Sequence, residues 1–396
     1  MSDDAAQPGA RPDGGTGEPL RVAIDATPLL TPLTGIGVVT RATIDGLARR
    51  PDVAVSAFAV SFRGRDRLGG VVGPGVEVHG RPMAAWPLRE AWRRVDWPPL
   101  RWWIGDVDVV HSPNYVVPPS RPAAEVVTVQ DLTPFRLAHM GAPGTEHVAD
   151  LVRRAVRRGA WVHASSRFVA DEVRTLLDVD AERVVVVPHG VEPQLAGDPT
   201  RGRRLAGAER YVVAVGTIEP RKGLPVLVEA FDEVAGTDPD VHLVLAGSRG
   251  WGAEPVDEAV ARARHGDRVR LLGRIDDTER TDLLAGAAVL AYPSLYEGFG
   301  IPPLEAMAQG VPVVCSDAGA LPETVGDAAE VTVTGDAASL AAGLAAVLGD
   351  DDRRSQLAVR GRRRAATFTW ERAVSGLVDL YRSAAAARQD GPRRLR

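Results

Sequence analysis

Three residue types are almost missing from this 396-residue sequence, which holds one cysteine (Cys315), one asparagine (Asn114) and one lysine (Lys222). A single cysteine excludes an internal disulfide framework. No uninterrupted apolar run reaches the roughly 18 residues that a membrane-spanning helix needs. Arginine supplies every other basic side chain. We therefore expect the one lysine to stand where a compact ammonium is required and a guanidinium would not serve.

A strong charge of one sign is also lacking. The net charge is −5, with 45% apolar and 25% charged residues, which is typical of a globular protein and gives no reason to expect nucleic acid as a partner. Residues 1–19 lack the basic and apolar regions of a secretory signal and are rich in glycine, alanine and proline. We predict a disordered tail there and a cytoplasmic protein, with peripheral attachment at the inner face of the plasma membrane left open.

Short valine-rich runs alternate with helical patterns along the chain, which predicts α/β domains with parallel sheets covered on both faces. The alternation stops in a polar segment with glycine and proline and then restarts. The predicted parts are a tail at 1–19, a doubly wound domain at 20–191, a linker at 192–210, a second doubly wound domain at 211–366, a helix at 367–386 and a basic tail at 387–396. Two such sheets facing each other place the carboxyl ends of their strands around one cleft.

The strand that ends at Gly216 leads into Arg221 and Lys222, just before a predicted helix. A guanidinium fork beside a compact ammonium near a helix start suits a pyrophosphate. The alternative is an ordinary solvated helix start, although cations are mildly unfavourable there.

A second loop follows the strand predicted at 287–292. Two prolines predict a helix at 302–309, whose free N–H groups would face the cleft. Gly298 and Gly300 would let an anionic ligand approach the backbone closely. Glu297 and Glu305 would then reach such a ligand from one wall of the cleft.

At these residues the chain resembles the family 4 glycosyltransferases, whose Glu-x7-Glu motif is matched by Glu297 and Glu305. The resemblance covers nearly all of 21–386, and its motifs lie at 35–37, 126–135, 164–168, 187–191, 215–224, 297–307 and 368–371. It implies the α/β GT-B fold: two Rossmann-like domains facing a central cleft, with the C-terminal helix crossing back to the N-terminal domain.

The resemblance also implies a function. The expected reaction moves a hexose from a nucleotide-sugar to a glycan, lipid-linked or small-molecule acceptor with retention of configuration. Mannose is the first expectation, and glucose or N-acetylglucosamine comes next. In the family's proposed front-face mechanism the departing phosphate takes the acceptor proton, so no general base, metal ion or other cofactor is expected.

The roles of individual residues follow from the same resemblance. Glu305 is expected on the ribose hydroxyls, Glu297 on the donor sugar, and Arg221 and Lys222 on the diphosphate. The remaining donor-binding candidates are Gly35, Gly37, Gly216, Gly298, Phe299, Gly300 and Ile301. We assign the catalytic set to Arg221, Lys222, Glu297 and Gln130.

The first half of the chain carries the remaining candidate residues. Gly35 and Gly37 open a helical pattern too far from the preceding strand for a dinucleotide fingerprint, and we interpret them as the family's glycine loop or as a plain helix start. Gln130 stands where the family usually has histidine, a departure that affects donor choice or rate. His111, Asn114 and Asp131 are candidate acceptor or sugar contacts, with a structural histidine as the alternative for His111.

Two features could have pointed elsewhere. The Asp-x-Asp triplets at 106–108 and 178–180 resemble manganese sites of other glycosyltransferases, but one precedes a strand and the other ends a helix, so we expect solvated carboxylates. Residues 81–103 hold five of the eight tryptophans among arginines. This pattern suits either a membrane surface or lipid-linked acceptor, or ordinary packing.

Two other classes of function stay open from the sequence. One is a different enzyme on the same fold, a nucleotide-sugar epimerase or a phosphorylase. The other is a non-catalytic nucleotide-sugar-binding protein, which the departure at Gln130 makes conceivable.

Overall fold

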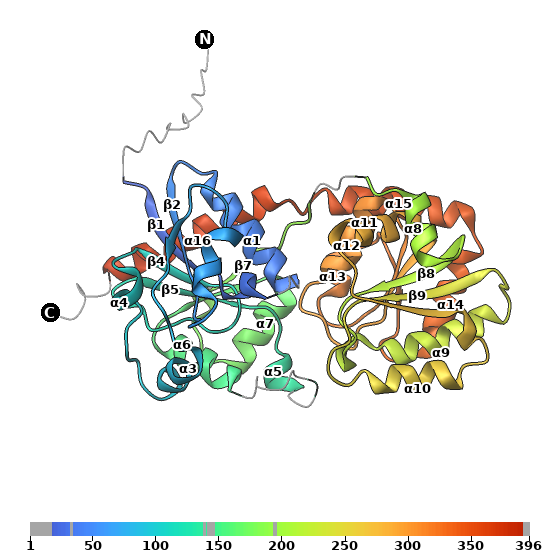
Figure 1. The fold of residues 1–396 in the computed structure, drawn as a ribbon, viewed down its shortest axis with the longest axis horizontal. Helices are drawn as coiled ribbons and strands as arrows, with labels where there is room; N and C mark the ends of the chain where they lie inside the picture. The colour runs from blue at the N-terminus through green and yellow to red at the C-terminus, as the bar shows by residue number, and fades with distance from the viewer. Residues whose placement is uncertain (1–17, 32–34, 138–139, 141–146, 193–195, 391–396) are drawn as a thin grey trace, which may run out of the picture.

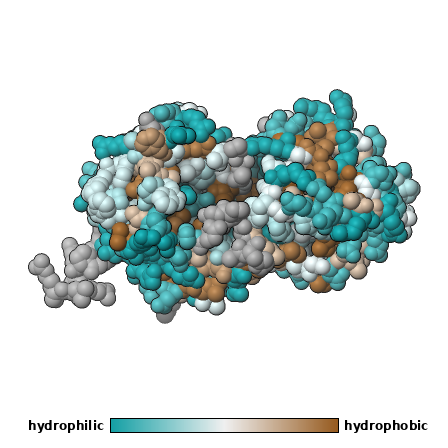
Figure 2. All heavy atoms as spheres, turned by 60° about the horizontal axis from the view of Figure 1, so that its bottom comes forward, coloured by the Kyte–Doolittle hydropathy of each residue, from teal (hydrophilic) through white to brown (hydrophobic). Residues whose placement is uncertain are grey.

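The computed structural model describes residues 18–31, 35–137, 140, 147–192 and 196–390. The chain forms two lobes side by side along its long axis (Figure 1), and the space-filling view shows them as rounded bodies joined at a narrower waist (Figure 2). Each lobe is built on one parallel sheet, which confirms the expected pair of doubly wound domains.

The first sheet has seven strands in the order β3-β2-β1-β4-β5-β6-β7. Its strands are β1 (Leu20–Asp25), β2 (Val53–Phe58), β3 (Glu77–His79), β4 (Val109–Ser112), β5 (Ala124–Val129), β6 (Trp161–Ala164) and β7 (Val184–Val186). The helices of this lobe are α1 (Gly35–Ala48), α2 (Leu68–Val71), α3 (Ala85–Arg94), α4 (Arg101–Ile104), α5 (Thr133–Arg136), α6 (Val148–Arg157) and α7 (Arg167–Leu176).

The second sheet has six strands in the order β10-β9-β8-β11-β12-β13. Its strands are β8 (Arg210–Val215), β9 (Val241–Ala246), β10 (Val269–Gly273), β11 (Val289–Tyr292), β12 (Val313–Ser316) and β13 (Glu330–Thr332). The helices are α8 (Pro199–Ala206), α9 (Leu224–Ala235), α10 (Glu254–Arg262), α11 (Asp277–Gly286), α12 (Ile301–Gln309), α13 (Leu321–Val325), α14 (Ala337–Leu348) and α15 (Asp351–Ala365). The last helix is α16 (Trp370–Asp390).

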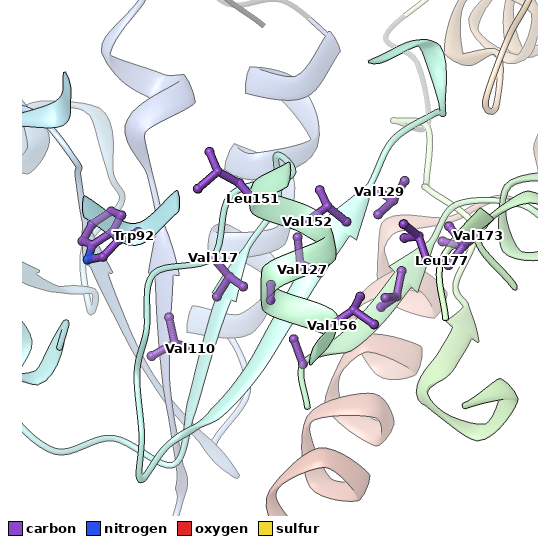
Figure 3. Close-up of a cluster of buried hydrophobic side chains, with 14 of the residues drawn as sticks. Trp92, Val110, Val117, Val127, Val129, Leu151, Val152, Val156, Val173 and Leu177 are labelled. Carbon is purple, nitrogen blue, oxygen red and sulfur yellow. The ribbon is translucent and has the colours of Figure 1, made fainter. Parts of the chain in front are cut away.

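Burial on both faces explains the valine-rich strands. All residues of β4, β5, β11 and β12 are buried, as parallel strands between two helix layers must be. Figure 3 shows one of these layers, in which Leu151, Val152 and Val156 of α6 lie over Val127 and Val129 of β5.

One element was not expected. The predicted linker at 192–210 is wrong for its second half, where Asp198 caps α8 by accepting hydrogen bonds from Thr200 and Arg201. The helix packs closely on α11, because a Cβ on Gly202 would lie 2.0 Å from the Asp282 carbonyl oxygen. Three arginines and little periodicity had concealed this helix in the sequence.

The C-terminal helix crosses back to the first lobe, as predicted. Val374, Leu377 and Tyr381 of α16 are buried among side chains of the first lobe. Where α16 meets α1, a Cβ on Gly46 would lie 2.4 Å from a methyl carbon of Val374. The chain passes between the lobes twice, after β7 and before α16. These two segments run side by side, since the Val191 N–H donates a hydrogen bond to the Phe368 carbonyl. No helix in the described part of the chain is long and apolar enough to span a bilayer.

Candidate active site

The central cluster of the candidate site lies at the carboxyl ends of β8 and β11. The Lys222 ammonium donates to the Tyr292 hydroxyl at 2.6 Å and to Glu297 Oε2 at 2.8 Å. An Arg221 Nη1 lies 3.1 Å from the same carboxylate oxygen and also donates to the Tyr296 carbonyl. The structure therefore brings together three of the four residues assigned to catalysis.

Electrostatics keeps this cluster ionised although it is largely buried. Burial alone would raise the pKa of the Glu297 carboxyl, but the charges of Lys222 and Arg221 hold it at about 2. Burial lowers the pKa of Lys222, and Glu297 opposes that shift. Glu219, which accepts a hydrogen bond from Arg221 at 2.8 Å, is a further member that the sequence analysis missed. Two cations and two carboxylates thus form one preformed network.

Glu305 forms a second pair farther along the same wall. Arg280 Nη1 of α11 lies 2.9 and 3.0 Å from the two oxygens of the Glu305 carboxylate. Burial raises the pKa of Glu305, and the charge of Arg280 opposes this effect. Arg280 was missed because an arginine on an amphipathic helix carries no signal that it faces inward.

The start of α12 connects these two groups. The helix begins at Ile301, one residue before the predicted start, and Gly300 precedes it with φ 102°, a conformation that favours glycine. Phe299 points into the core, with its ring 5.2 Å from that of His189 and 5.7 Å from that of Phe368. Phe299 is thus placed to support the loop by packing. The N–H groups of Gly300 and Ile301 remain suited to an anion, because Pro302 and Pro303 have no N–H to offer.

The loop at 296–300 also contacts the first lobe. Ser166 Oγ donates to the Gly298 carbonyl at 2.8 Å. A Cβ on Gly298 would lie 2.0 Å from the Gln130 carbonyl oxygen and 2.9 Å from the Asp131 Cβ. Only glycine permits this approach of the two backbones, so Gly298 acts as an interlobe contact in addition to any role toward a ligand.

Gln130 is held between neighbouring loops. Its amide nitrogen donates to the Pro113 carbonyl at 2.8 Å, and its amide oxygen accepts from His189 Nε2 at 3.1 Å. Among the described residues, one N–H and one lone pair of the amide have no further partner. The catalytic assignment of Gln130 stays a prediction, and the amide also has a structural role that the sequence did not reveal.

His111 does not contact the cleft. It is buried, its Nδ1 lies 2.6 Å from the Tyr381 hydroxyl, and its Nε2 lies 2.8 Å from Thr128 Oγ1. The candidate sugar contact is therefore wrong, and the alternative of a structural histidine holds. With both ring nitrogens occupied, His111 has no position left for a ligand.

Of the other first-lobe candidates, Asp131 lies beside Gly298 of the second lobe. Asp131 accepts hydrogen bonds from the Tyr115 hydroxyl and from the Thr133 N–H. Asn114 is exposed, and its side chain has no hydrogen bond to described residues. Their roles toward a sugar or acceptor stay predictions.

The glycine loop faces the same region. Gly35 is exposed at the start of α1, with no atom near the position of a Cβ, whereas Gly37 is buried. Ile301 of α12 and Val38 of α1 pack against one apolar cluster of Val39, Trp370 and Ala373, which brings the starts of these two helices near each other across the lobes. Gly216 has φ 143°, and a Cβ there would meet Lys222 Cε at 3.8 Å. Gly216 thus lies beside Lys222, whereas Phe299 points into the core, and the donor-binding roles of the predicted residues stay predictions.

The tryptophan-rich segment at 81–103 divides in two. Trp92 is buried and donates its indole N–H to the Pro98 carbonyl, and Trp103 donates to the Pro82 carbonyl. Trp86, Trp97 and Trp102 are exposed by 79%, 59% and 50%. Ordinary packing accounts for the first two tryptophans but not for the other three.

Comparisons with known proteins show what the chain is similar to. The family model described as Glycosyl transferases group 1 matches residues 201–364, and the model described as Glycosyltransferase Family 4 matches residues 33–195. The O-antigen chain mannosyltransferase B of Escherichia coli is 29% identical over 391 residues, which cover 92% of this chain and 100% of that protein. The phosphatidyl-myo-inositol mannosyltransferase of Mycolicibacterium smegmatis is 29% identical over 299 residues, which cover 72% and 74%.

A solved structure shows the fold. The sucrose-phosphate synthase of Thermosynechococcus elongatus superposes with a TM-score of 0.73 at 20% identity, covering 93% of this chain and 100% of that one. Two facing Rossmann-like lobes and the returning C-terminal helix are thus the GT-B architecture.

Proposed function

The chain belongs to glycosyltransferase family 4, and we propose that it is a retaining transferase that moves a hexose from a nucleotide-sugar to a glycan, lipid-linked or small-molecule acceptor. Mannose stands first, because two relatives matched over most of their length are mannosyltransferases. The observation that carries the proposal is the buried, ionised cluster of Arg221, Lys222 and Glu297 beside the start of α12.

The proposed chemistry depends on charge. As the bond between the sugar and the phosphate breaks, negative charge grows on the departing diphosphate while the anomeric carbon becomes positive. Arg221, Lys222 and the N–H groups at the start of α12 would stabilise the first charge, and Glu297 would stabilise the second. Because Glu297 already holds both cations in place, little reorganisation is needed when the donor binds.

Retention and independence of metals belong to the same proposal. Since protein cations are assigned to neutralise the diphosphate, we expect full turnover in EDTA and an α-linked product from an α-linked donor. NMR of the product gives the anomeric configuration directly. An absolute requirement for Mn²⁺, or inversion, would contradict this part of the proposal.

The identifying experiment is a thermal-shift screen with GDP-mannose, UDP-glucose and UDP-N-acetylglucosamine. A donor at 100 times its Kd stabilises the folded state by about 2.7 kcal/mol. The donor that binds is then incubated with and without acceptor mixtures. Transfer to an acceptor supports the proposal; isomerised sugar without an acceptor would indicate an epimerase, and sugar 1-phosphate from a glycan a phosphorylase. No stabilisation by any nucleotide-sugar would contradict the proposed function.

A second proposal concerns location. Trp97 and Trp102 stack edge to face with ring centroids 5.4 Å apart and remain exposed, and indole rings are well suited to a bilayer interface. We propose that they contact a membrane surface. Trp97→Ala with Trp102→Ala should reduce sedimentation with phospholipid vesicles, whereas Val359→Ala, an exposed apolar side chain of α15, should not. Equal sedimentation of both variants would contradict the contact.

A further inference from the structure

A groove of about 990 Å³ lies at the end of the first lobe that is remote from the active site. It opens beside Ala124 and Trp161, the first residues of β5 and β6. The active-site cleft lies at the opposite, carboxyl ends of the strands. The proposed transferase function therefore makes no use of this groove.

Arginine dominates its walls. The lining includes six arginines and no acidic residue among the described residues: Arg101, Arg121, Arg157, Arg158, Arg183 and Arg388. We call this feature the arginine groove. Its side chains come from loops and helices far apart in sequence, from α4 to α16, so the cluster is a product of the fold.

Only part of this positive charge is neutralised. Arg158 pairs with the buried Glu125 at 2.9 Å, and Arg183 pairs with Asp180 at 3.2 Å. Asp96, in an adjoining pocket, pairs with Arg154 and lies 3.4 Å from Arg158.

The other arginines have no such partner. Arg101 and Arg157 form no ion pair with described residues, and Arg121 donates only to the Arg158 carbonyl. Burial and the positive charges of Arg121, Arg183 and Arg158 lower the pKa of Arg388, against an opposing effect of Glu125.

A cluster of like charges in a chain of net charge −5 needs an explanation. Guanidinium groups that face one another repel and gain nothing from the fold in return, unless a ligand supplies the missing negative charge. The guanidinium fork matches two oxygens of one phosphate, and several forks around one groove match several phosphates.

We propose that the arginine groove binds clustered phosphate groups, carried either by a soluble polyphosphorylated molecule or by phospholipid headgroups. The groove is large enough for more than one phosphate. Its rim at Pro99 and Arg101 adjoins the exposed Trp97 and Trp102, so a bilayer that seats phosphates in the groove would also meet these rings. This inference does not depend on the proposed enzymatic activity.

Isothermal titration calorimetry with inorganic tripolyphosphate at low salt tests the site. The full chain should bind, and Arg101→Glu with Arg157→Glu should weaken binding at least tenfold, since both side chains are exposed and form no ion pair within the described part of the chain. The matched control is Arg360→Glu with Arg363→Glu, two exposed arginines of α15 in the other lobe. It makes the same change in net charge and should leave Kd unchanged. Circular dichroism checks that each variant folds. If the glutamate double variant does not fold, the variant Arg101→Ala with Arg157→Ala is used in its place.

Vesicle sedimentation distinguishes the two sources of phosphate. Binding to vesicles of phosphatidylcholine with phosphatidylglycerol, but not to phosphatidylcholine alone, and its loss in the groove variant would assign phospholipid headgroups. Tripolyphosphate binding without vesicle binding would assign a soluble ligand. The proposal is overturned if the wild type binds neither probe, or if the α15 control loses as much affinity as the groove variant.

Discussion

Lys222 is the residue whose environment is most restrictive. Its ammonium lies between the Tyr292 hydroxyl and Glu297, and 4.7 Å from the centre of the Tyr292 ring. A planar guanidinium is larger and cannot direct a single point charge at this place. We expect Lys222→Arg to lower kcat/KM nearly as much as Lys222→Ala. Arg360→Lys at an exposed position is the control for the exchange itself. Full turnover in Lys222→Arg would make the single lysine an accident of composition.

Arg280 is expected to act through Glu305 and not on the substrate directly. Because burial raises the pKa of Glu305 and Arg280 opposes that shift, Arg280→Ala should raise the pKa further. Nucleotide affinity should then fall most at low pH and recover as the pH rises and the carboxyl ionises. Glu305→Ala should weaken nucleotide binding about ten- to a hundredfold at every pH, as expected for a charged hydrogen bond.

Titration calorimetry between pH 5.5 and 8.5 measures both variants. Arg274→Ala, in the loop between β10 and α11, serves as a control. Identical pH profiles for wild type and Arg280→Ala would show that Arg280 does not set the ionisation of Glu305.

The sequence predicted the site best where the functional residues lie in short motifs directly after strands. Arg221, Lys222 and Glu297 were predicted together and lie together, because each follows a strand of the same sheet. Arg280 and Glu219 could not be predicted, since their partners are set by how helices and loops meet in three dimensions. His111 was misplaced because it lies within β4, near the carboxyl end of the strand, where a side chain can turn toward the cleft or toward the core, and only Tyr381, 270 residues later, decides which.

At the scale of elements, a chain of hydrogen bonds holds α16 to the first sheet. The Val187 carbonyl can only accept, so His163 Nε2 donates to it and His163 Nδ1 accepts from the Thr128 hydroxyl. Thr128 then accepts from His111 Nε2, and His111 Nδ1 accepts from the Tyr381 hydroxyl. Every member thus has one defined direction, which requires both histidines to be neutral.

This chain makes stability depend on pH. Burial lowers the pKa of His163 to about 4 and that of His189 to about 3, and lowers the pKa of His111 well below its usual value. Below about pH 6.5 the unfolded chain binds protons that the folded chain excludes, so the free energy of unfolding must fall as the pH falls. Each histidine contributes a slope of up to about 1.4 kcal/mol per pH unit.

Urea unfolding between pH 7.5 and 5.5 measures this slope, in a range where most carboxyl groups do not titrate. His189→Gln should reduce the slope, and His242→Gln, at the surface end of β9, should leave it unchanged. A stability that does not vary across this range would show that the buried histidines are not kept neutral.

The element scale also explains why α8 was missed. Its sequence holds three arginines and a glycine, and its burial depends on contact with α11, some 80 residues away. The local sequence pattern predicts the strands and the long apolar helices, because the spacing of their apolar residues follows which side chains are buried. A short polar helix that packs through its glycine, such as α8, shows no apolar periodicity in the sequence.

At the scale of the whole molecule, the net charge does not reveal how the charged side chains are distributed over the surface. The net charge of −5 gave no reason to expect an anionic partner, yet the fold gathers six arginines around one groove. Near the cleft the lobes meet through polar contacts as well as through the aromatic contacts of Tyr296 and Phe299. Leu132 donates its N–H to the Tyr296 hydroxyl, and Tyr296 in turn donates to Glu172.

Glu323 provides a polar contact between the lobes. Its two carboxylate oxygens accept the N–H groups of Arg167 and Phe168 at the start of α7, at 3.0 and 3.2 Å. A carboxylate at a helix N-terminus is favourable, and here it belongs to the opposite lobe. Ser166 already caps α7 by accepting from Val169, so the helix does not need Glu323 in order to fold.

Removing this carboxylate should therefore loosen the closed arrangement without unfolding either lobe. A charged hydrogen bond is worth about 1.5 to 3 kcal/mol, so Glu323→Ala should shift the balance between closed and open lobes about ten- to a hundredfold toward open. Small-angle scattering should show a larger radius of gyration for Glu323→Ala, and addition of the donor should reduce the difference, because the proposed donor site lies between the lobes. Glu371→Ala, an exposed glutamate in the first turn of α16, should scatter like wild type. If Glu323→Ala keeps both the radius of gyration and the turnover of wild type, the packing around Tyr296 and Gly298 holds the lobes together by itself.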